Sequence, residues 1–181
     1  MKRNVQPSGH PFLCIALSCL AGCASTSTPA PTQPEIGVRG KSVLTVQGLR
    51  FRDANGNGQL DRYEDWRLPA DARIADLLPR MSLRQKAGMM LIDTLNAGCG
   101  GAVDGTSAVA FVREQKMTRF VLRSTANAKA DACDGSVKPG RGGYTVTPTQ
   151  LAQFQNAVQA LAEGEPLGIP IVFKDNPRNH Y

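Results

Sequence analysis

The chain has 181 residues, a formal net charge of +6 and a charged fraction of 20%. Lys and Arg are scattered, without a tight run or interleaved aromatic residues, which argues against a nucleic-acid-binding surface. Lys2 and Arg3 belong to a predicted targeting segment, so +6 minus two leaves +4 for the mature chain. The remainder is long enough for one domain or less.

Residues 1–22 are predicted to be a lipoprotein signal peptide. A basic start precedes an apolar run over residues 12–20, which is too short for a membrane-spanning helix of roughly 20 residues. The sequence Leu-Ala-Gly-Cys ending at Cys23 resembles a lipobox, so Cys23 is expected to carry the lipid that holds an exported protein on a membrane, periplasmic or at the cell surface. The alternative is ordinary secretion with Cys23 unmodified.

Residues 23–36 are rich in Ser, Thr and Pro and have almost no bulky apolar side chain to bury. This composition predicts a flexible linker between the membrane and the globular part, residues 37–181.

Residues 53–64 fit every position of the twelve-residue, EF-hand-like calcium loop. Calcium takes six to eight oxygen ligands, which one short segment can supply with this spacing. Gly58 permits the sharp turn at the sixth position. The alternative is a turn in which Asn and Asp side chains bond only to their own backbone. The predicted ligands are Asp53, Asn55, Asn57, Gln59, Asp61 and Glu64.

After this loop the pattern alternates between helices and strands. Helices are predicted over residues 69–78, 83–88 and 108–116 and from Thr147 onward, and strands over residues 89–92, 119–123 and 168–173. The second helix is expected to open with a capping box from Ser82 to Gln85, and the last with Thr147 at the cap and Pro148 at the first helical position. Strands separated by helices indicate a parallel sheet and an α/β fold class.

Two of the five cysteines leave with the signal, and Cys23 is assigned to the lipid. Cys99 and Cys133 remain and can pair outside the cytoplasm, in a loop of about 35 residues, for a gain of about 3 to 4 kcal/mol. Two unpaired, buried thiols are the other possibility.

Residues 51–69 and 80–89, followed by segments around Phe154 and residues 167–173, resemble the entry of family three of the glycoside hydrolases, as in bacterial β-glucosidases. The resemblance implies a partial (β/α)₈ TIM-type barrel behind the calcium loop. It also implies a retaining enzyme acting on terminal β-linked glucosyl or related residues. In this family the nucleophile and the acid/base lie on later strands, so no catalytic residue is expected before Tyr181, and the chain alone is expected to be an inactive, truncated fragment.

The resemblance also places sugar contacts just after the third strand. Asn176 stands where the family often has an Asp that holds sugar hydroxyls, with Arg178 and His180 as further candidates. A polar loop that only stabilises the barrel rim is the alternative.

Two other interpretations remain open. One is a non-enzymatic, calcium-stabilised envelope lipoprotein that binds a sugar or a partner. The other is a chain that pairs with a second polypeptide, the missing carboxyl-terminal part of the barrel.

Overall fold

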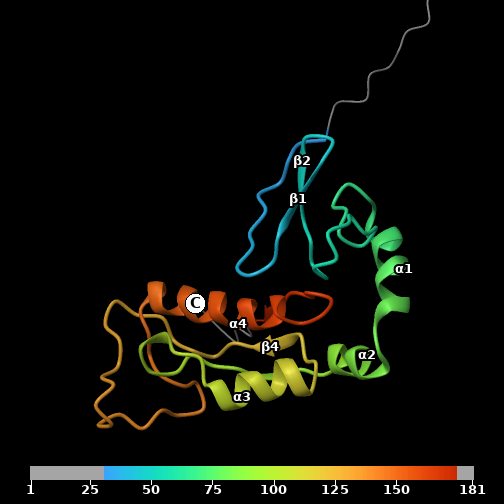
Figure 1. Cartoon of the computed structure of the whole chain (residues 1–181). Helices are drawn as coiled ribbons and strands as arrows, with labels where there is room; N and C mark the ends of the chain where they lie inside the picture. Colours follow the sequence, from blue (N-terminus) through green and yellow to red (C-terminus); the bar gives the residue numbers. More distant parts are fainter. Residues whose placement is uncertain (1–30, 175–181) are drawn as a thin grey trace, which may run out of the picture. The chain divides into compact units, whose positions relative to one another are not determined.

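The computed structural model describes residues 31–174 (Figure 1). Cys23 and the signal peptide lie outside these residues. No helix within them has the length and apolar character needed to cross a membrane.

A two-stranded antiparallel hairpin opens the described part. Strands β1, Val43–Val46, and β2, Leu49–Arg52, are joined by Gln47 and Gly48, which both have positive φ angles. Two such residues are typical of the tight turn whose twist matches that of the strands. Phe51 of β2 is fully buried and stacks on Trp66 at 5.4 Å between ring centroids, so the hairpin is fixed on the loop that follows it.

Two helices follow, both longer than predicted. Helix α1, Ala70–Arg80, runs through Pro79, which lies in its last turn. Helix α2, Leu83–Met90, starts with the expected capping box between Ser82 and Gln85. The predicted strand over residues 89–92 is therefore wrong, because Met89 and Met90 complete the last turn of α2, Leu91 caps it, and the strand begins only at Asp93.

Three short parallel strands form the second sheet, in the order β3–β4–β5. Their bounds are Asp93–Thr94, Arg119–Val121 and Val172–Lys174. Between β3 and β4 lie η1, Cys99–Gly101, α3, Gly105–Val109, and η2, Ala110–Glu114. Helix α4, Pro148–Glu163, connects β4 to β5, with Thr147 as its cap and Pro148 at its first position, as predicted, and with a capping box between Thr147 and Gln150. The α/β class is confirmed.

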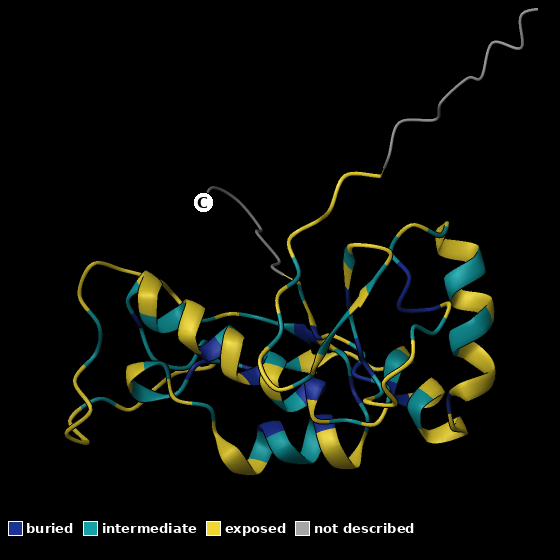
Figure 2. Cartoon of the chain, turned by 45° about the horizontal axis from the view of Figure 1, so that its top comes forward, coloured by how far each residue is buried: buried dark blue, intermediate teal, exposed yellow. Residues whose placement is uncertain are grey.

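The core lies between this sheet and its helices. Phe154 of α4 is fully buried and lies 6.1 Å from Phe173 of β5, between ring centroids. Phe173 is in turn 6.5 Å from Phe120 of β4. In Figure 2 many of the buried segments lie around these elements and others lie in the loop before α1, whereas α1 itself has no buried residue. The buried core residues are Leu95, Ala97, Ala108, Val112, Met117, Phe120, Val146, Phe154, Val158, Ala162 and Ile171.

The sheet stays open within residues 31–174, and no closed barrel is present there. Phe120 and Phe173 are paired in the register and belong to the helix-covered core. Their strand neighbours Arg119 and Val172 are also paired, and both are exposed, Val172 by 58%. Because side chains alternate along a strand, the second sheet face is the one left uncovered.

Glu163, at the end of α4, anchors the segment before the hairpin. It is 3% exposed, and its Oε2 accepts hydrogen bonds from the N–H groups of Arg39 (2.6 Å) and Gly40 (2.9 Å). The Arg39 guanidinium reaches its other oxygen at 3.4 Å. Burial by itself raises the pKa of this carboxyl, but the two N–H groups, the charge of Arg52 and the hydrogen bond from the Arg39 guanidinium outweigh it and lower the pKa below 4.5.

This anchor predicts an acid-sensitive contribution to stability. Because the folded-state pKa of Glu163 is lowered, its contribution is complete above about pH 4.5 and is lost as the pH falls through the folded-state value. We expect Glu163→Gln to lower the free energy of unfolding by about 1 to 3 kcal/mol at pH 7, and by clearly less at pH 3. Urea denaturation at both pH values measures this, with the exposed Glu114→Gln as control. An equal loss at both pH values would contradict it.

Candidate functional site

The predicted calcium loop is closed by hydrogen bonds from its own backbone. Asp53 is 2% exposed, and its two carboxylate oxygens accept the N–H groups of Asn57 (3.0 Å) and Gly58 (2.9 Å). Gly58 has a φ of +75°, which favours glycine, so the sharp turn lies at the predicted position. The side-chain oxygens of Asn55 and Asn57 accept the N–H groups of Asn57 (3.0 Å) and Gln59 (2.7 Å).

Two further carboxylates close the other end of this loop. Glu64, which is 7% exposed, accepts the N–H group of Asp61 with Oε2 at 3.0 Å and that of Asn55 with Oε1 at 3.3 Å. Asp61 Oδ2 accepts the side-chain amides of Asn55 (2.6 Å) and Asn57 (2.9 Å), and Arg80 donates to Oδ1 at 2.8 Å. Burial on its own raises the pKa of Asp61, but these bonds and the charge of Arg80 outweigh it and lower the pKa.

All six predicted ligands thus lie in one loop, and most of their polar atoms have hydrogen-bond partners. In residues 31–174 no group of three or more His, Cys, Asp or Glu side chains is placed to hold a metal ion. A carboxylate oxygen bonded to one N–H keeps a further lone pair for a cation. The calcium site stays a prediction, and the observed bonds are those of a self-closed turn.

The carboxyl ends of β3, β4 and β5 meet at one edge of the parallel sheet. Barrels and open α/β sheets bind their ligands at this edge. The loops after β3 and β4, residues 95–104 and 122–147, lie there, and β5 ends with Lys174. The predicted sugar contacts Asn176, Arg178 and His180 lie outside the described residues.

A disulfide joins these two loops. Cys99 and Cys133 are bonded through their Sγ atoms, with their Cα atoms 5.6 Å apart. Cys99 opens η1 in the loop after β3, and Cys133 lies near the middle of the loop after β4. Of the two possibilities that the sequence left open, a disulfide and two free thiols, the structure has the disulfide.

Several carboxyl groups outside the predicted calcium loop form structural contacts. Asp65 forms an ion pair with Arg67 at 2.7 Å, and the hydrogen bond from Arg67 is the main reason that the pKa of Asp65 is lowered. Asp104 caps α3 through the N–H of Thr106, and its pKa is lowered chiefly by the hydroxyl of Ser107. Every buried side-chain nitrogen or oxygen in this part of the chain has a hydrogen-bond partner. None of these carboxylates is arranged as a free acid or base.

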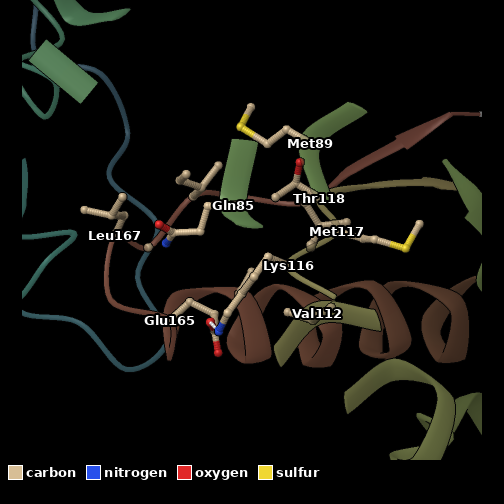
Figure 3. A pocket seen from close by; sticks show the side chains of 12 residues that line it. Gln85, Met89, Val112, Lys116, Met117, Thr118, Glu165 and Leu167 are labelled. Carbon is tan, nitrogen blue, oxygen red and sulfur yellow. Dashed lines mark hydrogen bonds and ion pairs between the residues drawn. The ribbon is translucent and has the colours of Figure 1, made fainter. Parts of the chain in front are cut away.

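Two cavities lie at the opposite, amino-terminal edge of the sheet. The first, of about 20 Å³, is lined by Thr118 and Ile171, just before β4 and β5, and by the ion pair of Lys116 and Glu165 (Figure 3). It has room for about one water molecule and is too small for a sugar.

The second cavity, of about 400 Å³, lies between α1 and residues 167–170. Two of its polar side chains already have partners, because Trp66 Nε1 donates to the Arg50 carbonyl (2.9 Å) and Arg73 Nε to that of Tyr63 (3.0 Å).

Comparison with known proteins shows which family of proteins the chain matches. No protein-family model matches the chain. The periplasmic β-glucosidase/β-xylosidase of Dickeya chrysanthemi is 33% identical over 174 residues, which cover 93% of this chain and 23% of that protein. β-Glucosidase C of Emericella nidulans is 29% identical over 120 residues, which cover 66% of this chain and 16% of that protein. The chain matches the amino-terminal part of β-glucosidase-type glycoside hydrolases.

The resemblance to these glycoside hydrolases is thereby confirmed. The chain spans about a quarter of the length of its bacterial relative and less of the fungal ones. Probable β-glucosidase C of Aspergillus oryzae, 29% identical over 126 residues, is matched over 16% of its length. The structure described above thus corresponds to the leading part of such a glycoside hydrolase.

Sequence reasoning missed three polar side chains in this glycoside hydrolase part. Asn96 and Ser124 bond the two loops at the carboxyl edge to each other, and Glu163 holds the segment around Arg39. Their partners lie 27 or more positions away in the chain, so no local pattern could have singled them out.

Proposed function

We propose that this chain is the amino-terminal part of an exo-acting glycoside hydrolase that removes terminal β-linked glucosyl or related residues with retention of configuration. The observation that carries the proposal is the match along 93% of the chain to a periplasmic β-glucosidase/β-xylosidase. The parallel strands, whose carboxyl ends meet at one edge, give such an enzyme the edge at which it binds its sugar.

The catalytic carboxyl groups belong to the portion of the relatives that this chain does not match. A retaining glycosidase needs two carboxyl groups about 5 to 5.5 Å apart, one of them an acid with a raised pKa. Within residues 31–174, the carboxyl groups with shifted pKa values, those of Asp61, Asp65, Asp104, Asp134 and Glu163, are all lowered. In this proposal the 181 residues alone are inactive, and carboxyl groups from the portion that the chain does not match complete the site.

The parallel sheet is the start of a (β/α)₈ barrel in this proposal. Three strands in sequential order, with α4 packed on one face, are the first repeats of such a barrel. The uncovered face around Val172 would then turn inward, and β3 and β5 would pair with later strands. Asn176, Arg178 and His180, which follow β5, would bind sugar hydroxyls.

The proposal also includes a lipid anchor at Cys23 and a structural calcium ion. The name of the periplasmic relative supports export, and the sequence before Cys23 supports a lipid anchor at that residue. The twelve-residue pattern supports structural calcium held by Asp53, Asn55, Asn57, Gln59, Asp61 and Glu64. Because Asn55 and Asn57 turn their amide nitrogens toward Asp61, calcium binding requires these side chains to reorient.

Turnover of an aryl β-glucoside tests the function. We expect the complete gene product to release the aryl group and to give β-glucose first, as seen by NMR, while the 181-residue chain shows no turnover above the uncatalysed rate. Hydrolysis by the 181 residues alone would contradict the location of the catalytic groups. Inactivity of the complete product, combined with firm sugar binding by the isolated chain in calorimetry, would favour a non-enzymatic envelope lipoprotein instead.

A further inference from the structure

The loop after β4 is long and has no helix or strand of its own. It covers residues 122–147, and its neck is closed by Asp131 and Thr145, whose backbones pair at 3.0 Å while the Asp131 carboxylate accepts the Thr145 N–H at 2.7 Å. The tip beyond this neck, residues 132–140, is almost wholly exposed. Apart from the turn in which Gly143 donates to the Gly140 carbonyl (3.0 Å), no hydrogen bond found in the described chain leads from the tip to another part of the protein.

The base of this loop is bonded to the loop after β3. Asn96 accepts the N–H of Arg123 and donates to the carbonyl of Arg141, both at 3.0 Å, so it spans the two ends of the β4 loop. The N–H of Ala97 donates to the hydroxyl of Ser124 at 2.8 Å. These bonds fix the base, but they lie outside the tip.

The tip has one covalent attachment, the disulfide between Cys133 and Cys99. Cys99 lies in η1, which is packed closely against the start of α4. A Cβ atom added at Gly101, where φ is +82°, would lie 2.5 Å from the Gln150 carbonyl oxygen. The disulfide thus ties an otherwise unsupported tip to a turn that has little room to move.

We propose that the Cys99–Cys133 disulfide is a lock that holds the β4 loop as a fixed wall of the sugar-binding opening at the carboxyl edge of the sheet. This role rests on the proposed glycosidase function. With the lock closed, the tip limits the space for the group attached to the terminal sugar. A dithiol reductant opens the lock by thiol–disulfide exchange, which leaves two cysteine thiols and an oxidised, cyclic reductant. The tip is then released, while Asn96 and Ser124 still hold the base.

Limited proteolysis tests the lock without any activity measurement. Lys129 and Arg141 are exposed trypsin sites within the loop, whereas the bond between Lys138 and Pro139 resists trypsin. We expect reduction to raise the rate of cleavage after Lys129, measured by mass spectrometry, by about tenfold or more, because local opening governs cleavage. The double variant Cys99→Ser/Cys133→Ser should be cleaved at the fast rate with or without reductant. Ser136→Ala is the control. The Ser136 hydroxyl donates only to Asp134, within the tip, so this variant should be cleaved like the wild type.

Two outcomes would overturn the lock. One is equal cleavage of the oxidised and the reduced wild-type chain, and the other is alkylation of both thiols before reduction. Wild-type protein reduced and alkylated after folding replaces the double variant if the latter fails to fold.

Kinetics separate the lock from the proposed function. With the complete gene product, reduction should change KM for glucosides with a large aglycone by about threefold or more, with kcat for a small aryl glucoside unchanged. An unchanged KM would refute the role of the loop as a wall, although hydrolysis would still support the glycosidase. Absence of hydrolysis in the oxidised protein would refute the glycosidase, whereas the proteolysis result would stand.

Discussion

Replacement of Phe154 by alanine is expected to lower the free energy of unfolding by about 3 to 5 kcal/mol. Phe154 is fully buried in the middle of α4 and packs beside Phe173, so its removal leaves a cavity at the contact between the helix and the sheet. The loss combines the transfer free energy of the ring with the contacts that its neighbours lose. Urea denaturation followed by circular dichroism measures the change.

Gln153→Ala is the matched control for this substitution. Gln153 is the preceding residue of the same helix, but it is exposed, so the change should stay within about 0.5 kcal/mol. A loss below about 1 kcal/mol for Phe154→Ala would show that α4 does not pack on the sheet as described.

The second large effect is expected at Asp53. Asp53→Ala removes the acceptor for the N–H groups of Asn57 and Gly58 and for the hydroxyl of Ser42, 3.3 Å away. Hydrogen bonds to a charged group contribute about 1.5 to 3 kcal/mol each, and donors left without a partner add to the loss, so we expect a destabilisation of about 3 kcal/mol even in the presence of a chelator. Thermal unfolding measures it, and the exposed Asp71→Asn is the control.

Thermal unfolding in the presence of calcium tests whether the loop binds this metal. If calcium binds the loop, a concentration of about 100 times its Kd stabilises the wild type by a further 2.7 kcal/mol or so, and this gain disappears in Asp53→Ala. An unchanged wild-type melting temperature after chelation, together with no bound metal in elemental analysis, would eliminate calcium. The loop would then be a turn stabilised by its own hydrogen bonds.

The sequence by itself predicted those structural features that depend on residues close together in the chain. The capping box at Ser82 and the pair Thr147–Pro148 predicted the starts of α2 and α4, because the residues that open a helix lie within three positions of one another. The turn at Gly58 was predicted from its place in the twelve-residue pattern. The ordered series of family motifs predicted the kinship with β-glucosidases, which the comparisons confirmed.

Only the tertiary structure decided the features that depend on distant partners. A short apolar run fits either a strand or the end of a helix, so the sequence could not show that Met89 and Met90 belong to α2. Cys99 pairs with Cys133, and Glu163 holds Arg39, because the folded chain brings together residues that are 34 and 124 positions apart. Composition and local pattern carry no information on such contacts, since they arise only when the helices have packed on the sheet.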